Sequence, residues 1–174
     1  MTRSIGLTTL LLDFAQARHG SGIPIRRKPS DLAEIARGVL DELEAAHPER
    51  TASLVAQGDA RGDWDADRMA QVISSLVTNA IQYGGGSAIA VTVQPGPAEV
   101  TVEVHNGGDP IPATLLPHLF DPFSGSFSSQ GAAHSVGLGL FISREIVRGH
   151  GGRIRVRSSK ADGTAFTVQL PRRA

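Results

Sequence analysis

One stretch constrains the fold of this chain more than any other: the apolar residues between 63 and 83 recur at intervals of three and four. They are Met69, Val72, Ile73, Leu76, Val77, Ala80 and Ile81. This spacing places them on one face of a helix, which must bury that face against another layer. The acidic Asp63–Asp67 stretch opens the predicted helix, and three glycines at 84–86 end it. The fold therefore needs a second layer of secondary structure.

The rest of the chain alternates between helical and strand patterns. Further helices are predicted over about 5–19, 31–46 and 138–148. Short strands are predicted at 23–27, 51–57, 88–93, 99–105, 153–158 and 164–170, with turns at 94–97 and 162–163. These elements predict an α/β two-layer sandwich, in which a mixed sheet carries about three helices on one face and one N-terminal helix precedes them.

Composition narrows the class of protein. The 174 residues are 40% hydrophobic but only 5% aromatic, which predicts one domain with an aliphatic core. A formal net charge of 0 argues against nucleic-acid binding, and the absence of cysteine excludes disulfides, cysteine-ligated zinc and thiol nucleophiles. The apolar stretch 5–14 contains Asp13 and is too short to span a membrane. We expect a cytoplasmic domain whose parent protein could still carry a membrane anchor.

The predicted helix over 63–83 carries the first candidate site. Ser75 and Asn79 are four residues apart and therefore share one helix face. Asn79 is a polar residue within an apolar run. Its amide can be bonded within the core, or its oxygen can be a ligand of Mg²⁺ on a nucleotide, since Mg²⁺ prefers oxygen donors.

A second block, from His105 to Pro112, directly follows a predicted strand. Its glycines allow the backbone to approach a flat ligand closely, and Asn106 can offer an amide oxygen to an adenine amino group. The same residues are also typical of an ordinary turn.

Two more blocks complete the pattern. Phe120 and Phe123 are three apart and are expected to pack the end of a loop onto the body of the domain. Gly137 and Gly139 open a predicted helix, where free N–H groups and the helix dipole favour a phosphate. This block follows a loop rather than a strand, which excludes the Walker A and Rossmann patterns.

The order of these four blocks resembles the Bergerat ATP-binding fold and, more narrowly, the catalytic domain of sensor histidine kinases. The stretches 150–154 and 162–171 also match that family, and the resemblance covers about residues 23–171. The sequence from Asn106 to Pro112 resembles kinases attached to phytochrome-like photosensors. Leu10 to Phe14 resembles the end of the second dimerisation helix. The implied division is a dimerisation-helix remnant at 1–20 and a catalytic domain at 21–174, with an ATP lid at about 124–136.

The resemblance implies ATP and Mg²⁺ as cofactors. Asn79 would hold the metal, with Ser75 as a second candidate. Gln82 stands where a lysine often reaches a phosphate, and Asn106 stands where an aspartate usually accepts from adenine. The residues implied in nucleotide binding are Asn79, Gln82, Tyr83, Asn106, Gly108, Ile111, Phe120, Phe123, His134, Gly137, Leu138, Gly139 and Leu140.

Two departures bear on the activity. Ser75 replaces the carboxylate that activates water in related ATPases, which disfavours a gyrase- or chaperone-type hydrolase and an anti-sigma-type serine kinase. The lid at 124–136 contains no lysine or arginine, so only His134 is available there to neutralise a transferring phosphate. We therefore expect slow use of ATP, and a nucleotide-binding pseudokinase acting as a dimerising scaffold is the alternative.

The phosphoacceptor of the family is absent. None of the six histidines precedes an acidic residue, as the acceptor histidine of these kinases does. We expect a fragment of a longer kinase, with the γ-phosphate of ATP passing to a histidine on a dimerisation domain outside this chain. The implied partners are that domain, a response regulator, and a second copy bound through the apolar N-terminal helix.

Overall fold

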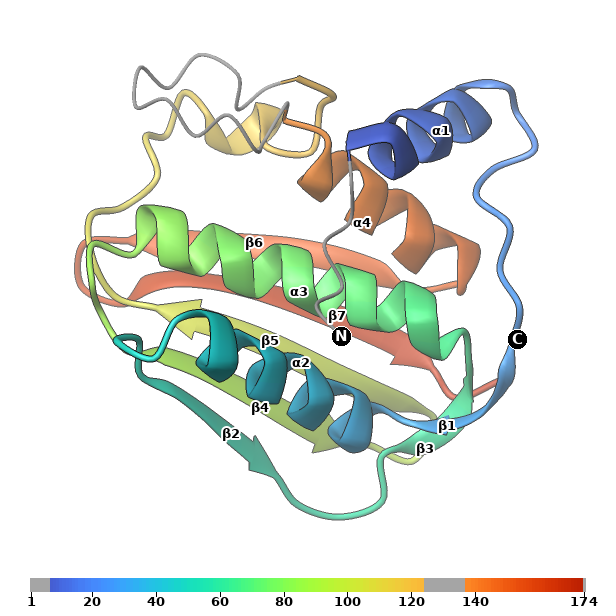
Figure 1. Cartoon of the computed structure of the whole chain (residues 1–174), viewed down its shortest axis with the longest axis horizontal. Helices are drawn as coiled ribbons and strands as arrows, with labels where there is room; N and C mark the ends of the chain where they lie inside the picture. Colours follow the sequence, from blue (N-terminus) through green and yellow to red (C-terminus); the bar gives the residue numbers. More distant parts are fainter. Residues whose placement is uncertain (1–6, 124–136, 174) are drawn as a thin grey trace.

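The computed structural model describes residues 7–123 and 137–173, which form two layers (Figure 1). One layer is a five-stranded sheet with the order β2-β4-β5-β7-β6. Its strands are β2 (Ala52–Ala56), β4 (Ile89–Pro95), β5 (Glu99–Asn106), β6 (Arg153–Ser159) and β7 (Gly163–Pro171). β2 pairs parallel to β4, and all the other pairs are antiparallel. The expected mixed sheet is confirmed.

Helices form the second layer, on one face of the sheet (Figure 1). Three of them pack on the sheet and a fourth lies over α4; they are α1 (Leu7–Arg18), α2 (Leu32–Ala46), α3 (Ala66–Tyr83) and α4 (Gly139–Gly149). A short 3₁₀ turn, η1 (Leu116–His118), lies in the connection between β5 and α4. The expected α/β sandwich with its preceding N-terminal helix is therefore confirmed. None of the described helices is long and apolar enough to cross a membrane.

The hydrophobic core lies between the sheet and the helices, where the buried face of each element is directed. In β5, the alternate residues Val100, Val102 and Val104 are buried, as a strand covered on one face requires. The apolar face predicted for α3 is also buried, from Met69 to Ala80. Aliphatic side chains fill most of the space between the layers.

Two short strands correct the sequence-based prediction. β1 (Lys28–Asp31) and β3 (Arg61–Trp64) form a separate antiparallel pair. The prediction placed a strand at 23–27 and assigned Asp63 and Trp64 to the start of the helix. Trp64 is instead fully buried, and its indole N–H donates to the carbonyl of Pro171 at 2.9 Å. That contact with the end of β7 holds β3 extended.

His150 connects the ends of two helices. Its Nε2 accepts from the backbone N–H of Asp65 at 3.0 Å, so its Nδ1 carries the proton and donates to the carbonyl of Ile146 at 2.8 Å. The side chain is completely buried, and this burial lowers the pKa of His150 below its ordinary value. A neutral imidazole thus ties the start of α3 to the end of α4.

Candidate functional site

The start of α4 lies directly against the middle of α3. A Cβ atom added to Gly139 would lie 2.8 Å from the hydroxyl oxygen of Ser75. Asn79 follows Ser75 by one helical turn on the same face of α3, and its side chain is half-buried. The backbone at Gly139 is therefore brought to the polar face of α3, and Ser75 forms part of the contact.

The C-terminal end of α3 lies against the turn that follows β5. Gly108 has φ of +98°, and a Cβ atom there would lie 2.8 Å from the carbonyl oxygen of Gly84. Any side chain at Gly108 would thus be strained by its backbone and blocked by another backbone. Gly84 was predicted only to end the helix, because its contact with Gly108 depends on the approach of distant segments.

Asn106, at the end of β5, is buried with 5% of its surface exposed. Its amide nitrogen donates to the carbonyl of Gly107 at 2.7 Å, which orients the amide and leaves its oxygen to act as an acceptor. An adenine amino group is a suitable donor to that oxygen.

The strands β6 and β7 support the segment after this turn. The backbone N–H of Ile111 donates to the hydroxyl of Ser158 at 2.8 Å, and Ser158 shares a hydrogen bond of 2.7 Å with Thr164. Thr164 is buried and pairs with Asn106 in the sheet register. Sequence reasoning missed both hydroxyls, since nothing in the local sequence distinguishes them from ordinary strand residues.

The two phenylalanines of the third block have different surroundings. Phe120 packs edge to face against Phe166 of β7, with ring centroids 6.2 Å apart. Phe123 has φ of +66°, its backbone N–H donates to the carbonyl of Gly137 at 3.0 Å, and its ring lies 5.3 Å from that of Phe14 on α1. The residues that flank 124–136 are therefore held together, and α1 contacts this junction.

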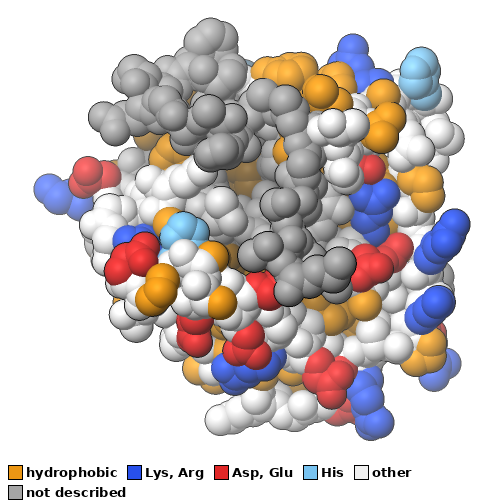
Figure 2. Space-filling model, viewed as in Figure 1, with side chains coloured by type: hydrophobic (Ala, Val, Ile, Leu, Met, Phe, Trp, Pro, Cys, Tyr) orange, Lys and Arg blue, Asp and Glu red, His pale blue; other side chains and the backbone are white. Residues whose placement is uncertain are grey.

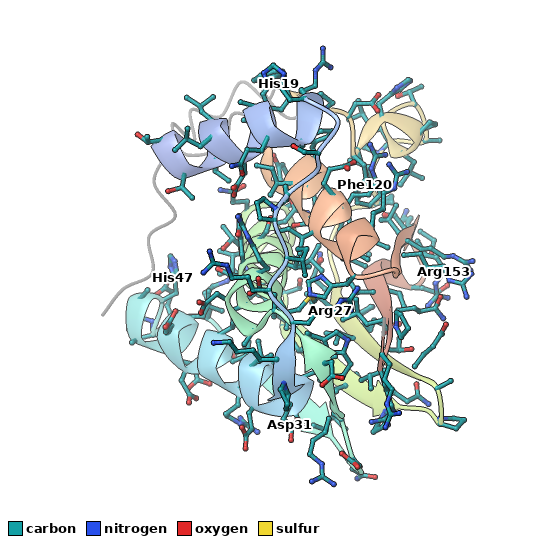
Figure 3. The ribbon with its side chains drawn as sticks, turned by 90° about the vertical axis from the view of Figure 1, so that its right-hand side faces the viewer. His19, Arg27, Asp31, His47, Phe120 and Arg153 are labelled. Carbon is teal, nitrogen blue, oxygen red and sulfur yellow. The ribbon has the colours of Figure 1, made fainter. Side chains whose placement is uncertain are left out.

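One cation near these rings was also missed. The guanidinium of Arg144 on α4 lies 5.8 Å from the ring centre of Phe120 and 6.0 Å from that of Phe141. Figure 3 shows Phe120 beside α4. The sequence could have indicated Arg144 by its position on the predicted helix, about one turn after the glycine block. Its positive charge lies on the side of α4 where the segment 107–123 packs.

The remaining predicted residues are placed as follows. Gln82 and Tyr83 are exposed in the last turn of α3. Leu138 is fully buried in the core, so its side chain supports the start of α4, whereas Leu140 is half-buried. His134 lies outside the described residues, as does the whole predicted lid at 124–136.

The donors at this site suit a nucleotide better than a metal alone. Within 7–123 and 137–173, no group of three His, Cys, Asp or Glu side chains could hold a metal ion. Asn79 supplies only a neutral oxygen, so a cation there would need the oxygens of a bound phosphate chain. A side chain at Gly139 would collide with Ser75 and one at Gly108 with Gly84, so both positions require glycine.

A sandwich with a polar helix face, a glycine turn after a strand and a glycine-led helix defines an ATP-binding domain of the Bergerat type. Comparison with known proteins gives the family. Residues 64–174 match the family described as histidine kinase-, DNA gyrase B- and HSP90-like ATPases. The chain belongs to that family, and it carries the ATP-binding catalytic domain of a sensor histidine kinase.

Individual relatives agree with this assignment. A bacteriophytochrome of Pseudomonas aeruginosa is 30% identical over 167 residues, which are 95% of this chain and 23% of that protein. The probable sensor histidine kinase TcrY of Mycobacterium tuberculosis is 34% identical over 164 residues, which are 89% of this chain and 33% of that protein. The solved catalytic domain of the histidine kinase ThkA is 30% identical with a TM-score of 0.75, covering 85% of this chain and 97% of that domain. The chain thus spans only 23% of the bacteriophytochrome and 33% of TcrY.

Proposed function

We propose that this domain binds ATP together with Mg²⁺ and donates the γ-phosphoryl group to a histidine on a dimerisation domain. The observation that carries the proposal is that two distant segments meet α3, the helix that carries Asn79. Gly139 lies against Ser75, one turn before Asn79, and Gly108 lies against Gly84 at the end of the helix. The phosphates would lie at the start of α4 and the adenine near Asn106.

In this reaction the acceptor nitrogen attacks the γ-phosphorus, the bond from that phosphorus to the bridging β–γ oxygen breaks, and ADP leaves. The catalysis consists mainly of positioning and charge stabilisation. Asn79 would help to hold Mg²⁺ through its amide oxygen, and the free N–H groups before and within the first turn of α4 would bind phosphate oxygens. When bound, Mg²⁺ supplies charge neutralisation on the phosphates.

The other proposed partners follow from the family. The solved complex of the histidine kinase ThkA with the response regulator TrrA includes a chain 27% identical to this one, with a TM-score of 0.74. We propose that the parent of this chain also passes its phosphate to a response regulator. We further propose that residues 1–20 end a dimerisation helix, because Leu11 and Leu12 of α1 are 45% and 62% exposed and are suited to packing against a second copy.

The test of the proposed function measures binding and transfer separately. Thermal unfolding with ATP or ADP, with and without Mg²⁺, is expected to show a nucleotide-dependent rise in melting temperature. Asn79→Asp should reduce the additional rise due to Mg²⁺ or change the metal preference. Thr78→Ala, at an exposed neighbour on another helix face, is the matched control and should behave as the unaltered domain.

Phosphoryl transfer is then measured with radiolabelled ATP and a separate dimerisation domain that carries the acceptor histidine. Slow labelling of that domain supports the kinase. Nucleotide binding without labelling supports the pseudokinase alternative, which the cation-free sequence of 124–136 favours. Absence of any thermal shift at millimolar nucleotide would refute the ATP site itself.

A further inference from the structure

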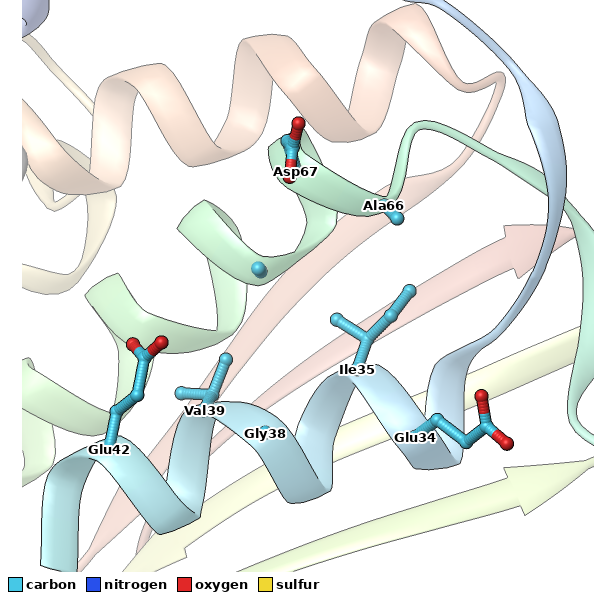
Figure 4. A pocket seen from close by; sticks show the side chains of 8 residues that line it. Glu34, Ile35, Gly38, Val39, Glu42, Ala66 and Asp67 are labelled. Carbon is cyan, nitrogen blue, oxygen red and sulfur yellow. The ribbon is translucent and has the colours of Figure 1, made fainter. Parts of the chain in front are cut away.

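A groove on the outer surface of the helical layer has no role in the proposed ATP site. It runs between α2 and the N-terminal half of α3 and has a volume of about 260 Å³ (Figure 4). Pockets for cofactors or drug-sized molecules occupy roughly 300–1,000 Å³. The groove is therefore suited to a few side chains rather than to a small-molecule ligand. It is lined by Glu34, Ile35, Gly38, Val39, Glu42, Ala66, Asp67 and Ala70.

The groove exists because small residues face each other across the two helices. Gly38 on α2 stands opposite Ala66 and Ala70 on α3, and a Cβ atom added to Gly38 would meet nothing within 4 Å. Ile35 and Val39 form an apolar wall beside this gap, as Figure 4 shows. Val39 and Ala70 are largely buried, so the half-buried Ile35 and the exposed Ala66 supply the apolar contact that the surface offers.

Acidic side chains border the apolar wall. Glu34 and Glu42 come from α2, eight residues apart and so about 12 Å apart along the helix axis. Asp67 contributes a third carboxylate from α3. α2 as a whole contains Glu34, Asp41, Glu42 and Glu44 but only one basic residue, Arg37. Figure 2 shows acidic side chains along the region of α2.

We propose that this groove is a docking site for a short, basic amphipathic segment of a partner protein. Lysine and arginine lay their aliphatic stems along apolar surfaces and keep their charged ends in polar surroundings. Here the stems would lie on Ile35 and Ala66 while the charged ends pair with Glu42 and Glu34. The groove adjoins α2, whereas Ser75 faces Gly139 of α4, so partner and nucleotide can bind together.

The first experiment titrates the ¹⁵N-labelled chain with a synthetic amphipathic peptide of lysine, leucine and alanine. The amide signals of Gly38, Val39 and Ala70 are expected to shift most. Glu42→Lys should weaken binding about tenfold, because it replaces an attractive charge pair with a repulsive one. Glu44→Lys makes the same charge change on α2 at an exposed position outside the groove and should retain affinity within about twofold.

The second experiment fills the groove. Gly38→Leu has open space for its side chain and replaces a helical glycine, so the fold should be retained or stabilised. Peptide binding should fall at least about tenfold, while the thermal shift with nucleotide stays unchanged.

Three results would overturn the proposal. Unchanged peptide affinity in Gly38→Leu would exclude the groove. Equal losses in the Glu42 and Glu44 variants would indicate general attraction to an acidic surface. Equal binding of a peptide with glutamate in place of lysine would exclude charge recognition.

Discussion

The attachment of α1 to the domain depends on an ion pair whose two members are buried to different extents. Nη1 of Arg68 on α3 lies 2.8 Å from Oδ2 of Asp13, and Gln71 donates to the same oxygen at 3.3 Å. The side chain of Asp13 is 5% exposed and that of Arg68 is 21% exposed. Phe14, next along α1, packs edge to face against Phe141 at 5.6 Å. The removal of Arg68 and the removal of Asp13 should therefore affect the docking of α1 to different extents.

Arg68→Ala leaves the buried carboxylate of Asp13 with one neutral amide donor. An uncompensated buried charge costs about 3–5 kcal/mol. α1 can avoid that cost by leaving the domain, because Asp13 lies on this helix and becomes solvated when Leu10, Phe14 and Ala17 detach from the core. The population of undocked α1 should then rise by roughly two to four orders of magnitude, at about 1.4 kcal/mol for each factor of ten. Asp13→Ala should have a smaller effect, since Arg68 keeps partial solvent contact and its bond to Gln71.

Native-state hydrogen exchange measures this undocking directly. In Arg68→Ala, the amides of α1 should lose protection, while those of β4, β5 and β7 keep theirs. Arg148→Ala removes a 61% exposed partner of Glu145 and should leave α1 protected. Full protection of α1 in Arg68→Ala would refute the reasoning, and so would an equal loss of protection in α1 and the central strands.

Three further predictions concern single contacts. Burial lowers the pKa of His150 below its unfolded value of 6.5, so its contribution to stability is complete above pH 6.5 and declines below it, as the unfolded state takes up a proton. The corresponding decrease in the free energy of unfolding between pH 7 and 5, measured by denaturant unfolding, should be absent in His150→Gln. Gly108→Ala should lower the free energy of unfolding by about 1–3 kcal/mol, since φ is positive and the carbonyl of Gly84 blocks the methyl group; an unchanged denaturation midpoint would contradict this close approach. Gly139→Ala should weaken the thermal shift with ATP, and adding Ser75→Ala in the same chain should restore part of that shift, because it removes the obstructing oxygen. If the effects of the two single substitutions on the thermal shift simply add in the double variant, the two residues do not meet in solution.

Local sequence predicted the regular elements well, because their signals are periodic or depend on one residue. The apolar spacing of α3 required one buried face, and a helix was predicted to begin at about residue 31. In the structure the carboxylate of Asp31 accepts from the N–H of Ala33 at 2.8 Å. Gly163 has φ of +75° in the turn predicted between the last two strands. Each of these outcomes depends on neighbours within a few residues.

The candidate site was predictable only in part. Asn79, Asn106, Gly108 and Gly139 were found because the order of their blocks resembles a known family, and the role of each in binding ATP stays a prediction. The supporting residues around them had no such signal. The hydroxyl of Ser158 and the carbonyl of Gly84 gain their roles from segments more than twenty residues away in sequence.

The sequence by itself determined where the helices and the strands of the main sheet form, and that one aliphatic core joins them, because hydrophobic periodicity and capping act over a few residues. Tertiary structure alone decided the pairing of β1 with β3, the docking of α1 through Asp13, and the contact of Gly108 with Gly84. These features are fixed by complementary shape and charge between distant segments. Their energies arise only once the sheet and helices are assembled, so no local pattern records them.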